Sequence, residues 1–145
     1  MMKYLGLDLG SKTLGIAISD ASNTIASVLK TIRFSDEDYQ SLIEPLKEIL
    51  INNDVKTVVL GYPLNMNGTV GVRAEICLKF KEMLEKQLNV SVVMEDERLT
   101  SVISNQILIE ADLSRKKRKK KVDGLAAQII LQSYLDRKGG IKNEG

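Results

Sequence analysis

Residues 3–19 read KYLGLDLGSKTLGIAIS, and this stretch decides the fold. Leucines alternate with other residues, a period of two that predicts a strand ending near Asp8. The turn at residues 10–13 leads into a second strand over residues 15–19, and a third strand is expected over residues 24–33. Because the connections between these strands are short, we expect them to form an antiparallel meander.

The rest of the chain alternates between helical and strand-like patterns. Apolar residues recur at helical spacing or in short runs, which predicts helices at about residues 38–52, 72–88, 100–111 and 122–136 and strands at 57–60 and 90–94. Because a helix precedes each of the last two strands, both should run parallel to the first strand. The predicted architecture is α/β: a five-stranded mixed sheet, three antiparallel strands followed by two parallel ones, with helices on both faces.

Length and composition limit the possible functions. At 145 residues and 16.1 kDa the chain has the size of one domain, which we place at residues 1–138 with a flexible tail at 139–145. It contains no His and one Cys, which excludes a Ser-His-Asp triad, a His-ligated zinc site and Cys-rich zinc modules. The N-terminus has no secretory pattern and no apolar run is long enough to span a membrane, so we expect a cytoplasmic protein.

The charge is distributed unevenly along the chain. The net charge is only +2, yet residues 115–121 are seven consecutive bases, and the remaining 14 bases and 19 acids give a net charge of −5. Most charge runs are solvated loops, and we expect a loop here, but so dense a run inside the chain favours a segment that binds phosphates. Its members are Arg115, Lys116, Lys117, Arg118, Lys119, Lys120 and Lys121.

Carboxylates are the strongest chemical signal in the sequence. Asp8 ends an apolar strand, three acids follow the fifth strand at residues 95–97, and Asp123 stands in the first turn of the last predicted helix. Each has an ordinary structural explanation, as a turn residue or as an acid near a helix N-terminus. Because ligands gather where the carboxyl ends of parallel strands meet, we instead expect these acids to cluster. The small residues 126–127 would let the last helix pack closely and bring Asp123 to the site.

Such a cluster suits one or two Mg²⁺ or Mn²⁺ ions. Hard cations bind carboxylate oxygens, and in phosphodiester cleavage they generate the attacking hydroxide and stabilise the leaving oxygen, so no His is needed. If the fourth strand lies between the first and the fifth, Asp8 and the strand-five acids start about 9–10 Å apart. Gly61 would leave room between them. Glu97 spans this gap better than Asp96 does, but the choice between them stays open because the parity of the strand end is not fixed.

The residues that carry these signals also resemble a known family. They are GLDLG (6–10), GYP (61–63), DERLT (96–100), KVD (121–123) and ILQSYL (130–135), and with the intervening glycines they are similar to the YqgF family over about residues 3–137. This is the bacterial Holliday-junction-resolvase-like group, also described as a pre-16S rRNA nuclease. The resemblance implies an RNase H-like fold, with Asp8, Glu97 and Asp123 as catalytic and metal-binding acids. Gly124 departs from the family, which usually has a better helix former there.

The resemblance implies a metal-dependent nuclease that trims the 5′ end of precursor 16S rRNA. We expect it to act on structured RNA or ribosomal particles, as a monomer or weak homodimer, with no membrane partner. Residues 115–121 and Arg98 would hold phosphates, with Lys12 and Arg73, each beside a glycine-bearing turn, as weaker candidates. Two alternatives stay open: a Holliday junction resolvase acting on branched DNA, which would require a dimer, and a non-catalytic RNA- or ribosome-binding protein.

Overall fold

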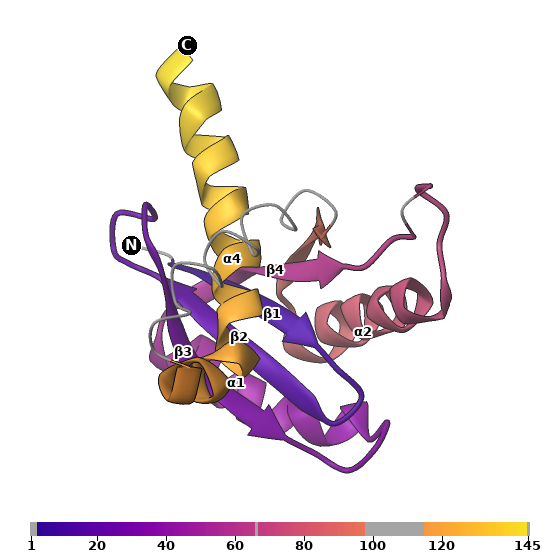
Figure 1. The fold of residues 1–145 in the computed structure, drawn as a ribbon. Coiled ribbons are helices and arrows are strands. Elements are labelled where there is room, and N and C mark those ends of the chain that lie inside the picture. The colour runs from indigo at the N-terminus through magenta and orange to yellow at the C-terminus, as the bar shows by residue number, and fades with distance from the viewer. Residues whose placement is uncertain (1–2, 66, 98–114, 145) are drawn as a thin grey trace.

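The sheet has the predicted architecture. The computed structural model describes residues 3–65, 67–97 and 115–144, the last of these with side chains for residues 124–138. The strands are β1 (Lys3–Leu9), β2 (Thr13–Ser19), β3 (Ala26–Arg33), β4 (Val55–Tyr62) and β5 (Ser91–Asp96), in the sheet order β3-β2-β1-β4-β5. β1, β2 and β3 form the antiparallel meander, and β4 and β5 run parallel to β1 (Figure 1). The fold class is confirmed, and β4 lies between β1 and β5.

Helices cover both faces of this sheet, as predicted. They are the 3-10 helix η1 (Tyr39–Leu42) and the α-helices α1 (Ile43–Asn52), α2 (Val72–Leu88) and α4 (Arg115–Glu144). Helices α1 and α2 pack on one face and α4 crosses the other (Figure 1). Pro45 falls in the first turn of α1, where its missing N–H removes no helical hydrogen bond. The helix predicted at residues 100–111 lies outside the described residues.

Helix α4 is longer than predicted. The basic residues 115–121 form its first two turns rather than a loop, and it continues to Glu144 instead of ending near Asp136. Lys and Arg are good helix formers, and packing on the sheet stabilises a helix that contains two glycines near its end. The boundary at residue 138 and the flexibility of residues 139–145 stay predictions. Neither α4 nor any other described helix is long and apolar enough to cross a lipid bilayer.

The two faces of the sheet are packed differently. On one face, large apolar side chains such as Phe80 and Leu84 of α2 fill the layer between the sheet and the helices α1 and α2. Under α4 the sheet carries small residues, with Gly6 of β1 directly against the helix. Because side chains alternate along a strand, Asp8 lies on the same face as Gly6. The carboxyl end of β1 therefore presents its acid toward the α4 side of the sheet.

Candidate functional site

Asp8 and Glu97 lie at the same edge of the sheet. Asp8 is half-buried near the end of β1, and Glu97 is the residue directly after β5. Between these two strands, Gly61 of β4 pairs with Glu95 of β5. A Cβ atom at Gly61 would lie 3.2 Å from Cδ and 3.4 Å from Cγ of Glu97. The Glu97 side chain therefore reaches over β4 and lies in the space that the missing side chain leaves.

The surroundings of Asp8 and Glu97 disfavour the ionised form of both carboxyl groups. Burial and, to a smaller extent, the negative charges of Asp8 and Asp96 raise the pKa of Glu97 to about 7. Burial also raises the pKa of Asp8 above its ordinary value. The two acids thus share a poorly hydrated site and interact electrostatically, which is the situation in which a bound cation is most favourable.

Helix α2 brings a positive charge to this pair. Arg73, in its first turn, donates a hydrogen bond from Nη2 to the carbonyl oxygen of Leu9 at 2.8 Å. Its charge lowers the pKa of both Asp8 and Glu97, although burial outweighs it at each. The guanidinium is therefore fixed at the end of β1, beside the acids.

Cys77, one turn further along α2, is a buried core residue. Burial raises the pKa of its thiol to about 11, and the negative charge of Glu97 acts in the same direction. In the metal-free protein the thiol is therefore protonated at neutral pH.

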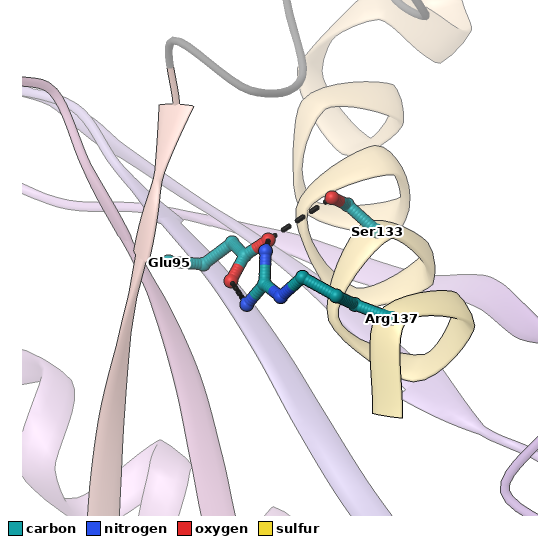
Figure 2. Close-up of polar contacts among 3 residues, drawn as sticks. All are labelled: Glu95, Ser133 and Arg137. Atoms are coloured by element: carbon teal, nitrogen blue, oxygen red, sulfur yellow. Dashed lines mark hydrogen bonds and ion pairs between the residues drawn. The ribbon is translucent and has the colours of Figure 1, made fainter. Parts of the chain in front are cut away.

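The structure extends β5 to Asp96, so two of the three consecutive acids lie within the strand, and the three have separate environments. Glu95 is fully buried and faces α4, where it accepts hydrogen bonds from Ser133 and Arg137 (Figure 2). Asp96 pairs with Tyr62 across the sheet, and alternation directs its side chain to the face opposite Glu95. Among the three, Glu97 supplies the side-chain atoms nearest to a Cβ atom at position 61, at 3.2 and 3.4 Å. Glu97 is therefore the stronger candidate ligand from this strand.

Helix α4 crosses the sheet directly above β1. The rings of Tyr4 and Tyr134 have centroids 5.6 Å apart. Two residues along β1, a Cβ atom at Gly6 would lie 2.6 Å from Cβ of Leu131 and 3.0 Å from the carbonyl oxygen of Ala127, one helical turn earlier. Gly124, three residues before Ala127, would place a Cβ atom 2.5 Å from Cγ1 of Val28 in β3, a residue in register with Ala17 and Gly6. The first described side chains of α4 therefore lie over β3, and the approach of Asp123 to Asp8 stays a prediction. The side chain of residue 123 itself lies outside the described part.

The remaining predicted site residues are placed in part. Lys12 is exposed in the turn between β1 and β2, and residues 115–121 are the N-terminal turns of α4, with side chains outside the described part. Arg98 lies outside the described residues. Among the described side chains, no three acids, histidines or cysteines stand together as a metal site. Asp8 and Glu97 form a pair there, and Asp123 as a third member stays a prediction.

Sequence reasoning missed the partners of Glu95. Ser133 and Arg137 follow it by 38 and 42 residues, and nothing in their local pattern separates them from an ordinary exposed helix face. A glutamate inside an apolar strand does signal that a partner is needed, because a buried carboxylate requires hydrogen bonds or a counter-charge. Which partner it finds depends on the register of α4 against β5.

Comparison with known proteins gives the family. The model of the RuvX family, described as Holliday junction resolvase, matches residues 2–137. A protein of Shouchella clausii named "Putative pre-16S rRNA nuclease" is 53% identical over 136 residues, which cover 94% of this chain and 96% of that protein. A Geobacillus protein of the same name is 47% identical over 137 residues, covering 94% of this chain and 99% of that one.

Solved structures with little sequence identity share the fold. The T. thermophilus RuvC structure in complex with a Holliday junction substrate has a TM-score of 0.62 at 14% identity and covers 97% of both chains. The fowlpox virus Holliday junction resolvase has a TM-score of 0.53 at 18% identity, covering 94% of this chain and 99% of that one. These resolvases have the RNase H-like fold, so the predicted fold is confirmed. The chain belongs to the RuvX family, the group recognised in its sequence as YqgF, and is a hydrolase that cleaves phosphodiester bonds.

Proposed function

We propose that this protein is a divalent-metal-dependent nuclease that trims the 5′ end of precursor 16S rRNA in the cytoplasm. The observation that carries the proposal is the placement of Glu97 over Gly61, beside Asp8 and at the carboxyl edge of the parallel strands. The names of the relatives that are 45–53% identical over nearly their whole length support this substrate.

The acids fit Mg²⁺ or Mn²⁺. Asp8 and Glu97 are oxygen donors with raised pKa values, and the position between them carries no side chain. Together with Asp123, and with Asp96 as a further candidate, they would hold one or two hard cations. When bound, such an ion supplies a hydroxide nucleophile at neutral pH and stabilises the leaving oxygen. The carboxylates of the chain orient the substrate phosphate relative to that ion.

Cations of the chain itself would hold the rest of the substrate. Arg73 is fixed at the end of β1 by one hydrogen bond, and a guanidinium has five N–H donors, so others can reach a phosphate oxygen beside the acids. Lys12 is exposed in the following turn. Arg98 follows Glu97 directly in the chain, and we retain it as a phosphate contact on its sequence position alone.

The N-terminal turns of α4 suit a polyanionic partner. Seven bases occupy residues 115–121, and the first turn of the helix carries no acid. The helix dipole places partial positive charge at the same end, so the bases repel both one another and the dipole. RNA phosphates would relieve this repulsion, and a structured RNA or a ribosomal particle supplies many of them close together. Branched DNA would do so equally well, which keeps junction cleavage as the second candidate, favoured by the description of the family.

One experiment separates these functions. The purified protein is incubated with precursor 16S rRNA and with a four-way DNA junction, each with Mg²⁺, with Mn²⁺ or with EDTA. We expect metal-dependent cleavage of the rRNA at its 5′ side, and loss of that cleavage in Asp8→Asn with binding of the RNA retained. Asp54→Asn is the matched control: it makes the same chemical change at the opposite end of β4, where the positive φ of 53° suits Asn equally well.

The outcomes are distinct. Cleavage of the DNA junction without cleavage of the rRNA would favour the resolvase. The mass of the protein–junction complex would then show whether the protein binds as a dimer. RNA binding without cleavage in any metal would favour the non-catalytic alternative. Full activity of Asp8→Asn would contradict the assignment of the site.

A further inference from the structure

A second buried carboxylate lies next to the candidate site but is not part of it. Glu95 is fully buried, and Arg137 donates to it from both terminal nitrogens of its guanidinium, with Nη1 2.7 Å from Oε2 and Nη2 bound to Oε1. Ser133 donates a further hydrogen bond to the same oxygen at 3.0 Å. Figure 2 shows the two α4 side chains converging on Glu95 from the adjacent turns of the helix. We call these three residues the Glu95 clamp.

The clamp acts on a strand that needs external support. β5 is an edge strand, so only β4 pairs with it, and the last pair is Asp96 with Tyr62. Near its beginning, the N–H of Val92 donates to Glu85 of α2 at 3.3 Å. At its other end the clamp ties the strand to α4 one residue before the last sheet pair. Glu97 follows that pair directly, so the clamp holds the strand two residues before Glu97.

The packing of α4 against β5 also affects how residue 123 and Glu97 lie relative to each other. Ile130, one turn before Ser133, would lie 2.6 Å from a Cβ atom at Gly61, the position over which Glu97 lies. Residue 123 is two turns earlier on the same helix. Sliding or rotating α4 against β5 would therefore change the position of residue 123 relative to Glu97.

We propose that Arg137 and Ser133 are positioning residues, which through Glu95 fix the end of β5 against α4 and hold Glu97 where it can bind a divalent cation. This inference rests on the proposed metal-dependent function. Residues behind metal ligands commonly change metal affinity or activity by 10- to 100-fold when they are replaced. A purely structural clamp would change stability without changing metal affinity in the folded protein.

The test separates orientation from stability. Removing one partner of a buried ion pair leaves an uncompensated charge, whereas replacing both by apolar residues of similar volume restores stability in many proteins. The main variant is therefore the double change Glu95→Leu and Arg137→Met, with Arg137→Lys as a milder form that keeps the charge but not the paired geometry. Urea unfolding without metal shows which variants are folded under assay conditions.

Gln132→Ala is the matched control. Gln132 accepts a hydrogen bond from the N–H of Ala26 and donates one to the carbonyl of Thr24, so it ties α4 to β3 at the opposite edge of the sheet. Its loss removes a comparable helix–strand contact without touching β5. A general loosening of α4 would appear in both variants, and an effect of the clamp only in the first.

The readouts are Mn²⁺ affinity by titration calorimetry, amide hydrogen exchange over residues 91–97 without metal, and kcat on precursor rRNA. We expect the double variant to bind Mn²⁺ at least tenfold more weakly than wild type, to exchange faster at the end of β5, and to lose kcat more than it raises KM. We expect Gln132→Ala to stay within about twofold of wild type in Mn²⁺ affinity. Arg137→Lys should lie between the two.

Two results would overturn the inference, and they differ. If wild type binds Mn²⁺ and cleaves while the folded double variant does both equally well, the clamp is structural and the proposed function stands. If wild type itself binds no divalent cation, the proposed function fails and the inference fails with it.

Discussion

Glu97→Gln should make the protein more stable at neutral and alkaline pH when no metal is present. The side chain keeps its size, so the contact over Gly61 stays, but the carboxylate that must lose its water on folding is gone. In wild type the pKa of Glu97 rises to about 7 because of burial and the charge of Asp8. The folded state therefore retains a proton that the unfolded chain has already released.

The sign and size of the effect follow from this difference. Since the folded protein binds more protons than the unfolded chain between the ordinary pKa of 4.5 and about 7, wild type loses stability as the pH rises through that window. At about 1.4 kcal/mol per pH unit, the full difference corresponds to at most about 3 kcal/mol. Because the side chain is half-buried and water screens part of its charge, we expect about 1–2 kcal/mol above pH 7.5. Below pH 4 both forms are neutral, and the two proteins should be equally stable.

The assay is urea unfolding of wild type and Glu97→Gln in EDTA, at half-unit steps from pH 4 to pH 8.5. Glu82→Gln, on the exposed side of α2, makes the same chemical change outside the site and should leave the pH dependence as in wild type. Adding Mg²⁺ at pH 8 should reduce the difference in free energy of unfolding between Glu97→Gln and wild type, because the cation stabilises only the protein with the intact acid pair. A stability difference that does not change with pH, or a variant less stable than wild type at pH 8, would refute the desolvated acid pair.

Three further predictions test the surroundings of the pair. Gly61→Val should destabilise the fold by about 1–3 kcal/mol through its clash with Ile130. Adding Ile130→Ala should recover stability in urea unfolding but not cleavage, and cleavage by the double variant would show that the space over β4 is not used. Arg73→Gln removes a charge that lowers the pKa of both acids, so the acidic limb of the pH–rate profile should move to higher pH; an unmoved limb would place Arg73 outside the site. Replacing Lys116, Lys117, Lys119 and Lys120 by Gln should flatten the log–log salt dependence of RNA binding by roughly 3 units, at about 0.7 per phosphate, whereas an unchanged slope would make the run a solvated helix end.

Local patterns were enough to predict the sheet, because the residues of each strand by themselves indicate how that strand is buried. The alternation up to Asp8 and the continuous apolar run before Gly61 report on burial within one strand, and the strand order follows from short turns and helical crossovers. The predicted bounds of α2 were also confirmed, since Gly71 precedes it and Asn89, in the left-handed conformation, ends it. In α4 no residue at either end gives a signal strong enough to outweigh packing on the sheet, and the predicted bounds of this helix were wrong.

The sequence was enough to predict a set of candidate acids, but not how their side chains and partners are arranged in space. Alternation and the position of glycine indicated that Asp8 and Glu97 would share an edge, and the structure places Glu97 over Gly61. The separate environment of Glu95 depends on two side chains of α4 that are distant in sequence. Helix register on a sheet is set by the fit of many side chains at once, so no single residue signals it.

The small residues under α4 connect the fold to the site. An added Cβ atom would lie 2.6 Å from Leu131 at Gly6, and one at Gly124 would lie 2.5 Å from Cγ1 of Val28 in β3. Gly124 costs about 1 kcal/mol of helix stability relative to Ala, but the Cβ atom of an Ala there would collide with Val28 of β3 in this packing. An aspartate has a single methylene between its backbone and its carboxylate. Residue 123 can serve the same site as Asp8 only if α4 lies close to the sheet, and the glycines on both surfaces permit that approach.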